Sequence, residues 1–200
     1  MKFFIKKHFL ITVFFLISLL PFIWIDFPYV RIKEELFFVN YAIVFKKYLY
    51  SWIGRLDMGF PNRFSYLSAA FPNSVFYYIG ELSGIHISVI QAFFLSFIIL
   101  LTLISIYTLI FYLTKNRRAS FLASLFYILN FYFRRALFYS ANMYQLILMP
   151  LFFVLLSKFL ETKKYKYVAY NYICLFIFQA VFANLPLAVT TFIVYLVALL

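Results

Sequence analysis

Residues 87–113 carry no charged side chain, and this run constrains the fold more than any other feature of the chain. A helix that spans a bilayer needs about 20 consecutive, predominantly apolar residues. The run is long enough for one, and it stops at the basic sequence KNRR, residues 115–118. It therefore predicts a transmembrane helix.

The composition of the whole chain agrees with this interpretation. Of its 200 residues, 66% are hydrophobic and 12% are charged, whereas a soluble domain is usually about 45–50% apolar and about 25% charged. A soluble fold of this size has too little interior to bury so much apolar surface. We therefore expect a multi-pass protein of the cell membrane.

Further apolar runs predict an all-α polytopic transmembrane bundle of about five or six spans, forming one membrane domain over residues 1–200. The first run lacks the small-residue cleavage site of a secretory signal, so we interpret it as an uncleaved span. The last run reaches Leu200 without a polar stop, which favours a truncated chain or part of a larger protein. The expected spans are residues 9–25, 87–113, 119–133, 137–160, 167–183 and 187–200.

The short basic connections set the expected orientation. Lys and Arg concentrate in the short cytoplasmic connections of membrane proteins. If the spans alternate, the basic N-terminus, KNRR at 115–118 and KKYK at 163–166 all fall on one side. We therefore expect a cytoplasmic N-terminus. Glu161 lies within the second basic connection, where we expect it to pair locally with a base.

The formal net charge of +12 would suggest nucleic acid in a soluble protein. Here the bases stand in short blocks between apolar runs, without a basic face or an RNA-binding motif. Membrane topology and anionic lipid headgroups explain them better. We expect the lipid bilayer as a partner and no nucleic acid. The lone Cys174 supplies neither a disulfide framework nor a C-x-x-C metal site.

Residues 26–85 differ in character from the rest and predict a folded extracytoplasmic loop. They hold five of the six acids and all four glycines, and glycine and proline mark turns and fixed bends. Residues 31–50 have the pattern of a helix lying in the membrane interface. Residues 71–84 predict a second short helix.

Two aspartates in this loop are candidate catalytic residues. Asp26 stands at the junction of the first span and water, where partial desolvation raises the pKa of a carboxyl group that lacks a paired cation or metal. Such a group can act as a general base on a substrate held at the membrane surface. The alternative is a helix-end aspartate that meets headgroup water. Asp57, between glycines in GRLDMGF, is either a second functional acid or a turn former.

Arg134 and Arg135 interrupt an aromatic run on the outer side, where topology does not require bases. Arginine binds phosphate through a planar fork of donors. The pair therefore suits a polyprenyl phosphate, or it extends to ordinary anionic headgroups. Both interpretations, a site for a polyprenyl phosphate and a contact with ordinary headgroups, stay open.

Taken in order, these parts resemble the integral-membrane (GT-C type) glycosyltransferases, above all the arabinofuranosyltransferase-like proteins and the large membrane glycosyltransferases. The aspartate-Pro-Tyr step also resembles the first acidic motif of oligosaccharyltransferase catalytic subunits. The matching stretches are WIDFPY (24–29), SWIGRLDMGFPNRFSYLSAAFPNSVFYYIGELSGI (51–85), VIQAFFLSFIILL (89–101) and SFLASLFYILNFYFRRALFYSANMYQLILMPLFF (120–153).

The resemblance implies an inverting transfer of a sugar from a polyprenyl-phosphate donor to an acceptor at the extracytoplasmic face. It implies that Asp26 deprotonates the acceptor hydroxyl, that Asp57 is a second acidic position, and that Arg134 and Arg135 hold the donor phosphate. It names no metal, and a divalent cation stays open as a cofactor. Members of the superfamily usually carry more spans, so a partner membrane subunit also stays open.

A non-catalytic transporter or assembly subunit is the alternative function. The break at ANLPL, residues 183–187, favours it because discontinuous helices near mid-membrane are typical of transporters. A transporter should, however, carry ionisable groups inside its spans. The acids of this chain gather instead in the outer loop, which favours chemistry at the membrane surface.

Overall fold

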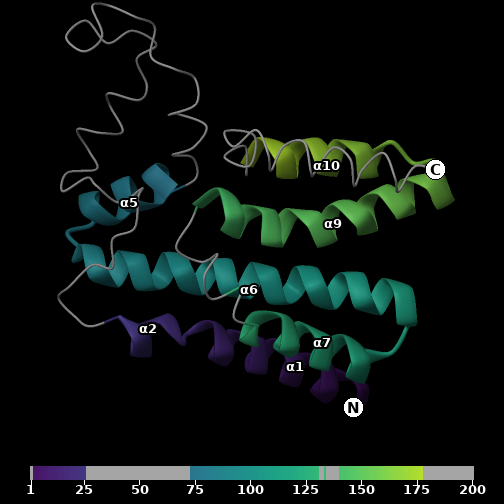
Figure 1. Cartoon of the computed structure of the whole chain (residues 1–200), viewed down its shortest axis with the longest axis horizontal. Helices are drawn as coiled ribbons and strands as arrows, with labels where there is room; N and C mark the ends of the chain where they lie inside the picture. The colour runs from purple at the N-terminus through teal and green to yellow at the C-terminus, as the bar shows by residue number, and fades with distance from the viewer. Residues whose placement is uncertain (1, 26–72, 131–132, 134–139, 178–200) are drawn as a thin grey trace, which may run out of the picture.

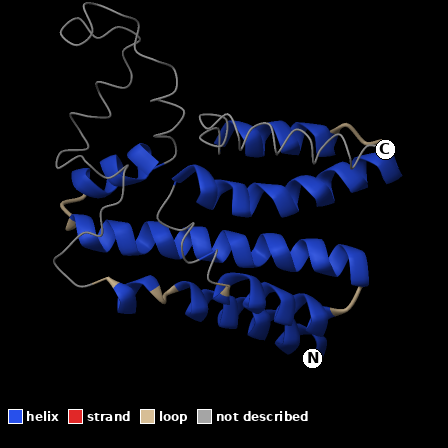
Figure 2. Ribbon diagram, in the orientation of Figure 1, coloured by secondary structure: helices blue, strands red, loops and turns tan. Residues whose placement is uncertain are grey.

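The computed structural model describes residues 2–25, 73–130, 133 and 140–177 (Figure 1). Within them every regular element is a helix (Figure 2), which confirms the all-α prediction for this part of the chain. The helices are α1 (Lys2–Ser18), α2 (Pro21–Trp24), α5 (Asn73–Leu82), α6 (Ile87–Thr114), α7 (Arg117–Leu129), α9 (Ser140–Thr162) and α10 (Lys166–Ile177).

Helix α6 is the centre of the bundle. Helices α1 and α7 lie along one side of it, α9 lies along the other, and α10 packs on the outer side of α9 (Figure 1). Helix α7 runs opposite to α6, and α10 runs opposite to α9. The α6–α7 and α9–α10 connections therefore turn at the same end of the bundle, where α1 also begins (Figure 1). The short helices α2 and α5 pack on α6 near its opposite end.

Two helices of the described part, α6 and α9, are long and apolar enough to cross a membrane. At about 1.5 Å per residue, the 28 residues of α6 extend roughly 42 Å, more than the ~30 Å of a bilayer core. Helix α7 has 13 residues, short of the about 20 that a span needs, and α10 reaches Ile177, the last residue that the structure describes. The predicted spans at 87–113 and 137–160 thus coincide with helices of sufficient length.

The first predicted span, residues 9–25, is helical but interrupted. Helix α1 ends at Ser18 and a new helix begins at Pro21. The break follows from Pro21, which has no N–H to donate and whose ring clashes with the preceding turn, so that proline is favoured at the start of a helix. The apolar helical stretch Phe9–Trp24 is accordingly shorter than α6 or α9.

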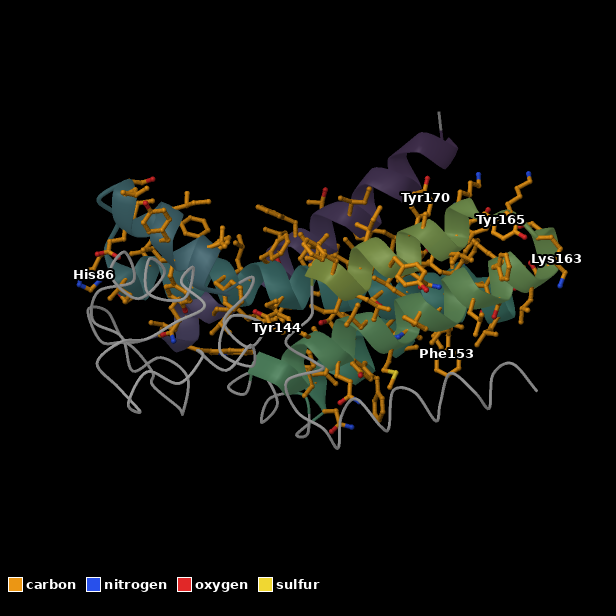
Figure 3. All side chains as sticks on the ribbon, turned by 90° about the horizontal axis from the view of Figure 1, so that it is seen from above. His86, Tyr144, Phe153, Lys163, Tyr165 and Tyr170 are labelled. Carbon is orange, nitrogen blue, oxygen red and sulfur yellow. The ribbon has the colours of Figure 1, made fainter. Side chains whose placement is uncertain are left out.

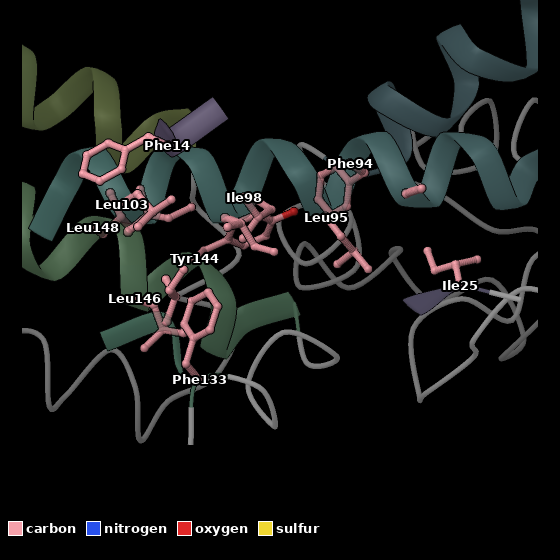
Figure 4. Packing of buried hydrophobic residues seen from close by; sticks show 14 of the residues in the cluster. Phe14, Ile25, Phe94, Leu95, Ile98, Leu103, Phe133, Tyr144, Leu146 and Leu148 are labelled. Carbon is pink, nitrogen blue, oxygen red and sulfur yellow. The ribbon is translucent and has the colours of Figure 1, made fainter. Parts of the chain in front are cut away.

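The core is built on α6 (Figure 4). Ile98 and Leu103 of α6 are fully buried and belong to one cluster with Ile147 and Leu148 of α9. On the opposite side Phe14 of α1 joins three helices. Its ring stacks on Phe121 of α7 with centroids 5.6 Å apart and meets Tyr107 of α6 edge-on at 5.8 Å.

Helix α7 turns its small side chains inward and its large apolar side chains outward. Its buried residues are Ser120, Ser124 and Ile128, and small residues at this spacing let two helix backbones approach closely, as in membrane bundles. Both serine hydroxyls are satisfied by carbonyls of their own helix, at 2.7 and 2.8 Å. The outward face carries Leu122, Phe126 and Leu129, which are 63%, 75% and 76% exposed.

Helix α9 contains Pro150 in its interior, and a serine of α6 bonds to the α9 backbone in the turn before the proline. Pro150 has no N–H to donate to the carbonyl of Leu146, four residues earlier. The buried hydroxyl of Ser105 donates 2.7 Å to the carbonyl oxygen of Ile147, in the turn just before the proline. The bond therefore joins α6 to α9 at the carbonyl next to the one that the proline frees.

Ser105→Ala is expected to destabilise the α6–α9 contact by ~0.6–1.7 kcal/mol, the range measured for hydrogen bonds between membrane helices. The free energy of unfolding in detergent micelles measures it. Thr108→Ala is the matched control, because the Thr108 hydroxyl bonds only within α6 to the Ile104 carbonyl. A cost of Ser105→Ala no larger than that of Thr108→Ala would contradict this account.

Helix α5 ends in a Schellman motif, which directs the chain into α6. Gly84 has a φ of 68°, its N–H donates to the Glu81 carbonyl at 3.0 Å, and the N–H of Ile85 donates to the Gly80 carbonyl at 3.2 Å. A glycine is favoured where φ is positive. The structure thus confirms the short helix predicted at 71–84.

Helix α6 then begins at a histidine cap. His86 precedes the first turn, and its Nδ1 accepts from the backbone N–H of Ser88 at 3.3 Å and lies 2.7 Å from the Ser88 hydroxyl. An acceptor at this position satisfies one of the free N–H groups of a helix start. His86 therefore has a structural role at the end of the bundle where α5 packs.

Candidate functional site

The candidate residues Asp26, Asp57, Arg134 and Arg135 lie outside the residues that the structure describes. The predicted interfacial helix at 31–50 and the span at 187–200 lie outside them as well. The structure therefore neither brings these four side chains together nor separates them.

The described residues on either side of the loop 26–72 show at which end of the bundle it begins and ends. Ile25, directly before Asp26, is buried in the core cluster and closes α2 through its N–H bond to the Pro21 carbonyl at 3.0 Å. After the loop, α5 packs against the first turns of α6. Both flanks lie at the end of α6 that is marked by His86, opposite Lys163 and Tyr165 (Figure 3).

The other end of the bundle is strongly basic, and we call it the cationic end. It comprises the α6–α7 and α9–α10 connections with the adjoining turns of those helices (Figure 1). The lysines Lys2, Lys6 and Lys7 belong to the first turns of α1, which begins at the same end. The described side chains that define it are Tyr112, Lys115, Arg117, Arg118, Lys158, Glu161, Lys163, Lys164, Tyr165, Lys166, Tyr167 and Tyr170.

The two connections of the cationic end have the same backbone construction. Lys115 and Lys163 directly follow α6 and α9, with φ of 54° and 53°. The N–H of Lys115 donates to the Phe111 carbonyl at 2.9 Å, and that of Lys163 to the Phe159 carbonyl at 2.7 Å. Each therefore ends its helix as a left-handed residue, a position that usually holds glycine or asparagine.

The residue before each of these lysines is a threonine. The hydroxyls of Thr114 and Thr162 donate to carbonyls one turn earlier, at 2.7 and 2.6 Å. The next helix on the first connection is capped by Asn116, whose Oδ1 accepts from the N–H groups of Arg118 and Ala119 at 3.0 and 3.2 Å. The caps hold both connections in fixed turns and keep their basic side chains at the bundle end.

A tyrosine and a glutamate join the two connections. The Tyr112 hydroxyl of α6 donates to the Glu161 carboxylate of α9 at 2.5 Å. Tyr112 lies one turn before Lys115, and Glu161 lies just before Lys163. The hydrogen bond therefore holds the basic turns side by side. The partner that the structure shows for Glu161 is a tyrosine, where the sequence predicted a base.

Aromatic rings support several of the ammonium groups at this end. The Lys115 ammonium lies 4.7 Å from the centroid of the Tyr112 ring, and Lys158 and Lys166 lie 5.9 and 5.3 Å from that of Tyr167. Cation–π contacts at exposed sites contribute about 0.5–1 kcal/mol each. Further out, Tyr165 is 79% exposed (Figure 3). Tyrosine with lysine in this arrangement is typical of a membrane–water interface.

The cationic end can bind anions but offers no site for a metal. Within the residues that the structure describes, no three His, Cys, Asp or Glu side chains lie close enough to hold an ion. Ammonium and guanidinium groups on flexible stems instead suit phosphate oxygens at a surface.

Two buried polar atoms in the described part lack a hydrogen-bond partner: Ser96 Oγ of α6 and Asn171 Oδ1 of α10. Burying such a group without a partner costs free energy. They lie on different helices, and α10 packs on α9 rather than on α6. They therefore do not define a common site.

Sequence reasoning located the basic blocks but missed how they are joined. The shared pattern F-x-x-T-K, at 111–115 and 159–163, was a usable signal for two equivalent turns. The Tyr112–Glu161 pair gave no such signal, because its two residues are far apart in the chain and neither stands in a recognisable motif.

No protein-family model, curated protein or solved structure matches this chain. The resemblance to membrane glycosyltransferases therefore rests on the sequence stretches alone.

Proposed function

We propose that this chain is a multi-pass membrane protein whose cationic end faces the cytoplasm. The outward apolar face of α7 is the observation that carries this proposal, since large exposed apolar surfaces are rare on soluble monomers and suit lipid. The basic connections at a single end of the bundle support the orientation, because short cytoplasmic connections are rich in Lys and Arg. The loop 26–72 then begins and ends on the extracytoplasmic side.

On this membrane scaffold we propose sugar transfer from a polyprenyl-phosphate donor, at the extracytoplasmic face. Asp26 would accept the proton of the acceptor hydroxyl, and Arg134 and Arg135 would bind the donor phosphate. The support is the motif resemblance together with the placement of α2, whose C-cap Ile25 precedes Asp26, at the end of the bundle away from the bases. Asp57 is the second acidic candidate.

A transporter or assembly subunit is the alternative function. A transport pathway requires ionisable groups inside the spans. Helix α6 carries no charged residue, and the charged residues of α9, Lys158 and Glu161, lie at its cationic end. This distribution favours the enzyme over the transporter.

The orientation is tested by labelling single cysteines with a membrane-impermeant maleimide, in a Cys174→Ser background. A cysteine at Ser83, exposed at the end of α5, should react in intact cells. A cysteine at Lys164, exposed at the cationic end, should react only after permeabilisation. The opposite pattern would overturn the orientation, and equal labelling at both sites in intact cells would overturn membrane insertion.

The enzymatic activity is tested on the purified full chain with radiolabelled polyprenyl-phosphate sugars. Transfer to an acceptor supports the enzyme. Absence of transfer with every donor, for a chain that passes the labelling test, would favour the subunit.

A further inference from the structure

We propose that the cationic end is a binding surface for anionic phospholipid headgroups of the cytoplasmic leaflet. The proposal rests on the membrane orientation given above and adds a partner that membrane insertion alone does not require. Any bilayer could accommodate the apolar helices, whereas a headgroup-binding surface depends on the lipid composition.

Basic side chains greatly outnumber acidic ones on this surface. Its described bases are Lys115, Arg117, Arg118, Lys158, Lys163, Lys164 and Lys166, and its acid is Glu161. The Tyr112 hydroxyl already binds the Glu161 carboxylate at the α6–α9 junction. The described bases therefore outnumber the single carboxylate seven to one, and the surface attracts anions. An anionic leaflet attracts the Lys and Arg side chains that lie near its surface.

The backbone fixes where these charges lie. Lys115 and Lys163 each follow a helix in the left-handed conformation, and both turns are exposed. The hydrogen bond between Tyr112 and Glu161 keeps the turns adjacent. The bases therefore form one surface across four helices rather than isolated charges at separate helix ends.

The apolar surface beside these charges selects a lipid over a soluble polyanion. Arg118 stands one turn before Leu122 on α7, and Leu122 begins the exposed apolar face that continues to Phe126 and Leu129. A charged surface that passes directly into an apolar one matches the boundary between headgroups and acyl chains. On the opposite side of the bundle, the exposed Tyr165 and Tyr170 flank Lys166 at the start of α10, as tyrosines of an aromatic belt do.

The test compares spin-labelled phosphatidylglycerol with spin-labelled phosphatidylcholine on the full chain in mixed bilayers. Electron paramagnetic resonance gives the relative association of each lipid with the protein. The wild type should prefer phosphatidylglycerol by about threefold or more at low salt, and the preference should fall at high salt. A wild type without preference would overturn the proposal.

Two matched triple variants separate charge from fold. Lys163→Gln, Lys164→Gln and Lys166→Gln together should bring the preference close to one, while Arg at the same three positions should retain it. If the Gln variant loses helicity by circular dichroism, Arg117→Gln with Arg118→Gln takes its place. Neutral variants that keep the full preference would also overturn the proposal.

Failure of this proposal is distinguishable from failure of the proposed orientation. The cysteine labelling at Ser83 and Lys164 reports insertion and direction in any lipid. A chain that inserts as proposed but shows no lipid preference overturns the headgroup surface alone.

Discussion

Asp26→Asn is expected to slow sugar transfer by ~10²–10⁴-fold, the usual contribution of a general base. The amide has nearly the shape of the carboxylate but cannot accept the proton of the acceptor hydroxyl. Donor binding should change little, because the proposed phosphate ligands, Arg134 and Arg135, stay in place. The rate at saturating donor, measured with the purified chain, is therefore the informative quantity.

The matched control for this experiment is Glu81→Gln. Glu81 belongs to α5, at the same end of the bundle as α2, and the variant removes one carboxylate from that end without altering Asp26. Its rate should stay near that of the wild type. If Asp26→Asn and Glu81→Gln transfer sugar equally well, Asp26 is not the base.

The helices that the sequence predicted best are those whose signal lies within their own residues and the residues next to them. The uncharged run at 87–113 corresponds to α6, and a short helix was expected where α5 lies, before Gly84. Both have local signals: a long apolar run in one case, and a glycine that ends a helix in the other. Pro21 gave an equally local signal, the break between α1 and α2, which the prediction of an unbroken span at 9–25 did not use.

Packing between distant residues could not be predicted in the same way. The sequence of α7 is apolar overall, and nothing in its composition shows that Ser120 and Ser124 face α6 while Phe126 faces outward. That choice depends on how closely α6 approaches, which small residues permit. The Ser105–Ile147 hydrogen bond depends in turn on the register between α6 and α9.

For the candidate site, the sequence predicted which residues are basic or acidic but not how the fold arranges them. It found the basic blocks at 115–118 and 163–166, and the structure places them at one end of the bundle. It did not predict that Lys115 and Lys163 would adopt the same left-handed turn, because lysine has no preference for that conformation. Asp26 and Asp57 remain predictions from the sequence.

Gly80→Ala is expected to destabilise the docking of α5 on α6 by ~1–3 kcal/mol. A Cβ at Gly80 would lie 2.6–3.0 Å from Cδ1, Cγ1 and Cγ2 of Ile90. Ile90 is buried, and a β-branched side chain in a helix has essentially one χ1 rotamer. Rotating only the terminal methyl group of Ile90 cannot relieve the clash. The backbone at Gly80 or the whole of α5 must therefore shift. The free energy of unfolding in detergent measures the effect.

The double variant decides whether this clash is the cause. In an Ile90→Ala background the obstructing atoms are gone, so Gly80→Ala should keep only the advantage of alanine over glycine in a helix, a stabilisation of about 0.5–1 kcal/mol. The sign of the Gly80→Ala effect is thus expected to reverse between the two backgrounds. A destabilisation of similar size in both would show that Gly80 serves the backbone of α5 rather than its contact with Ile90.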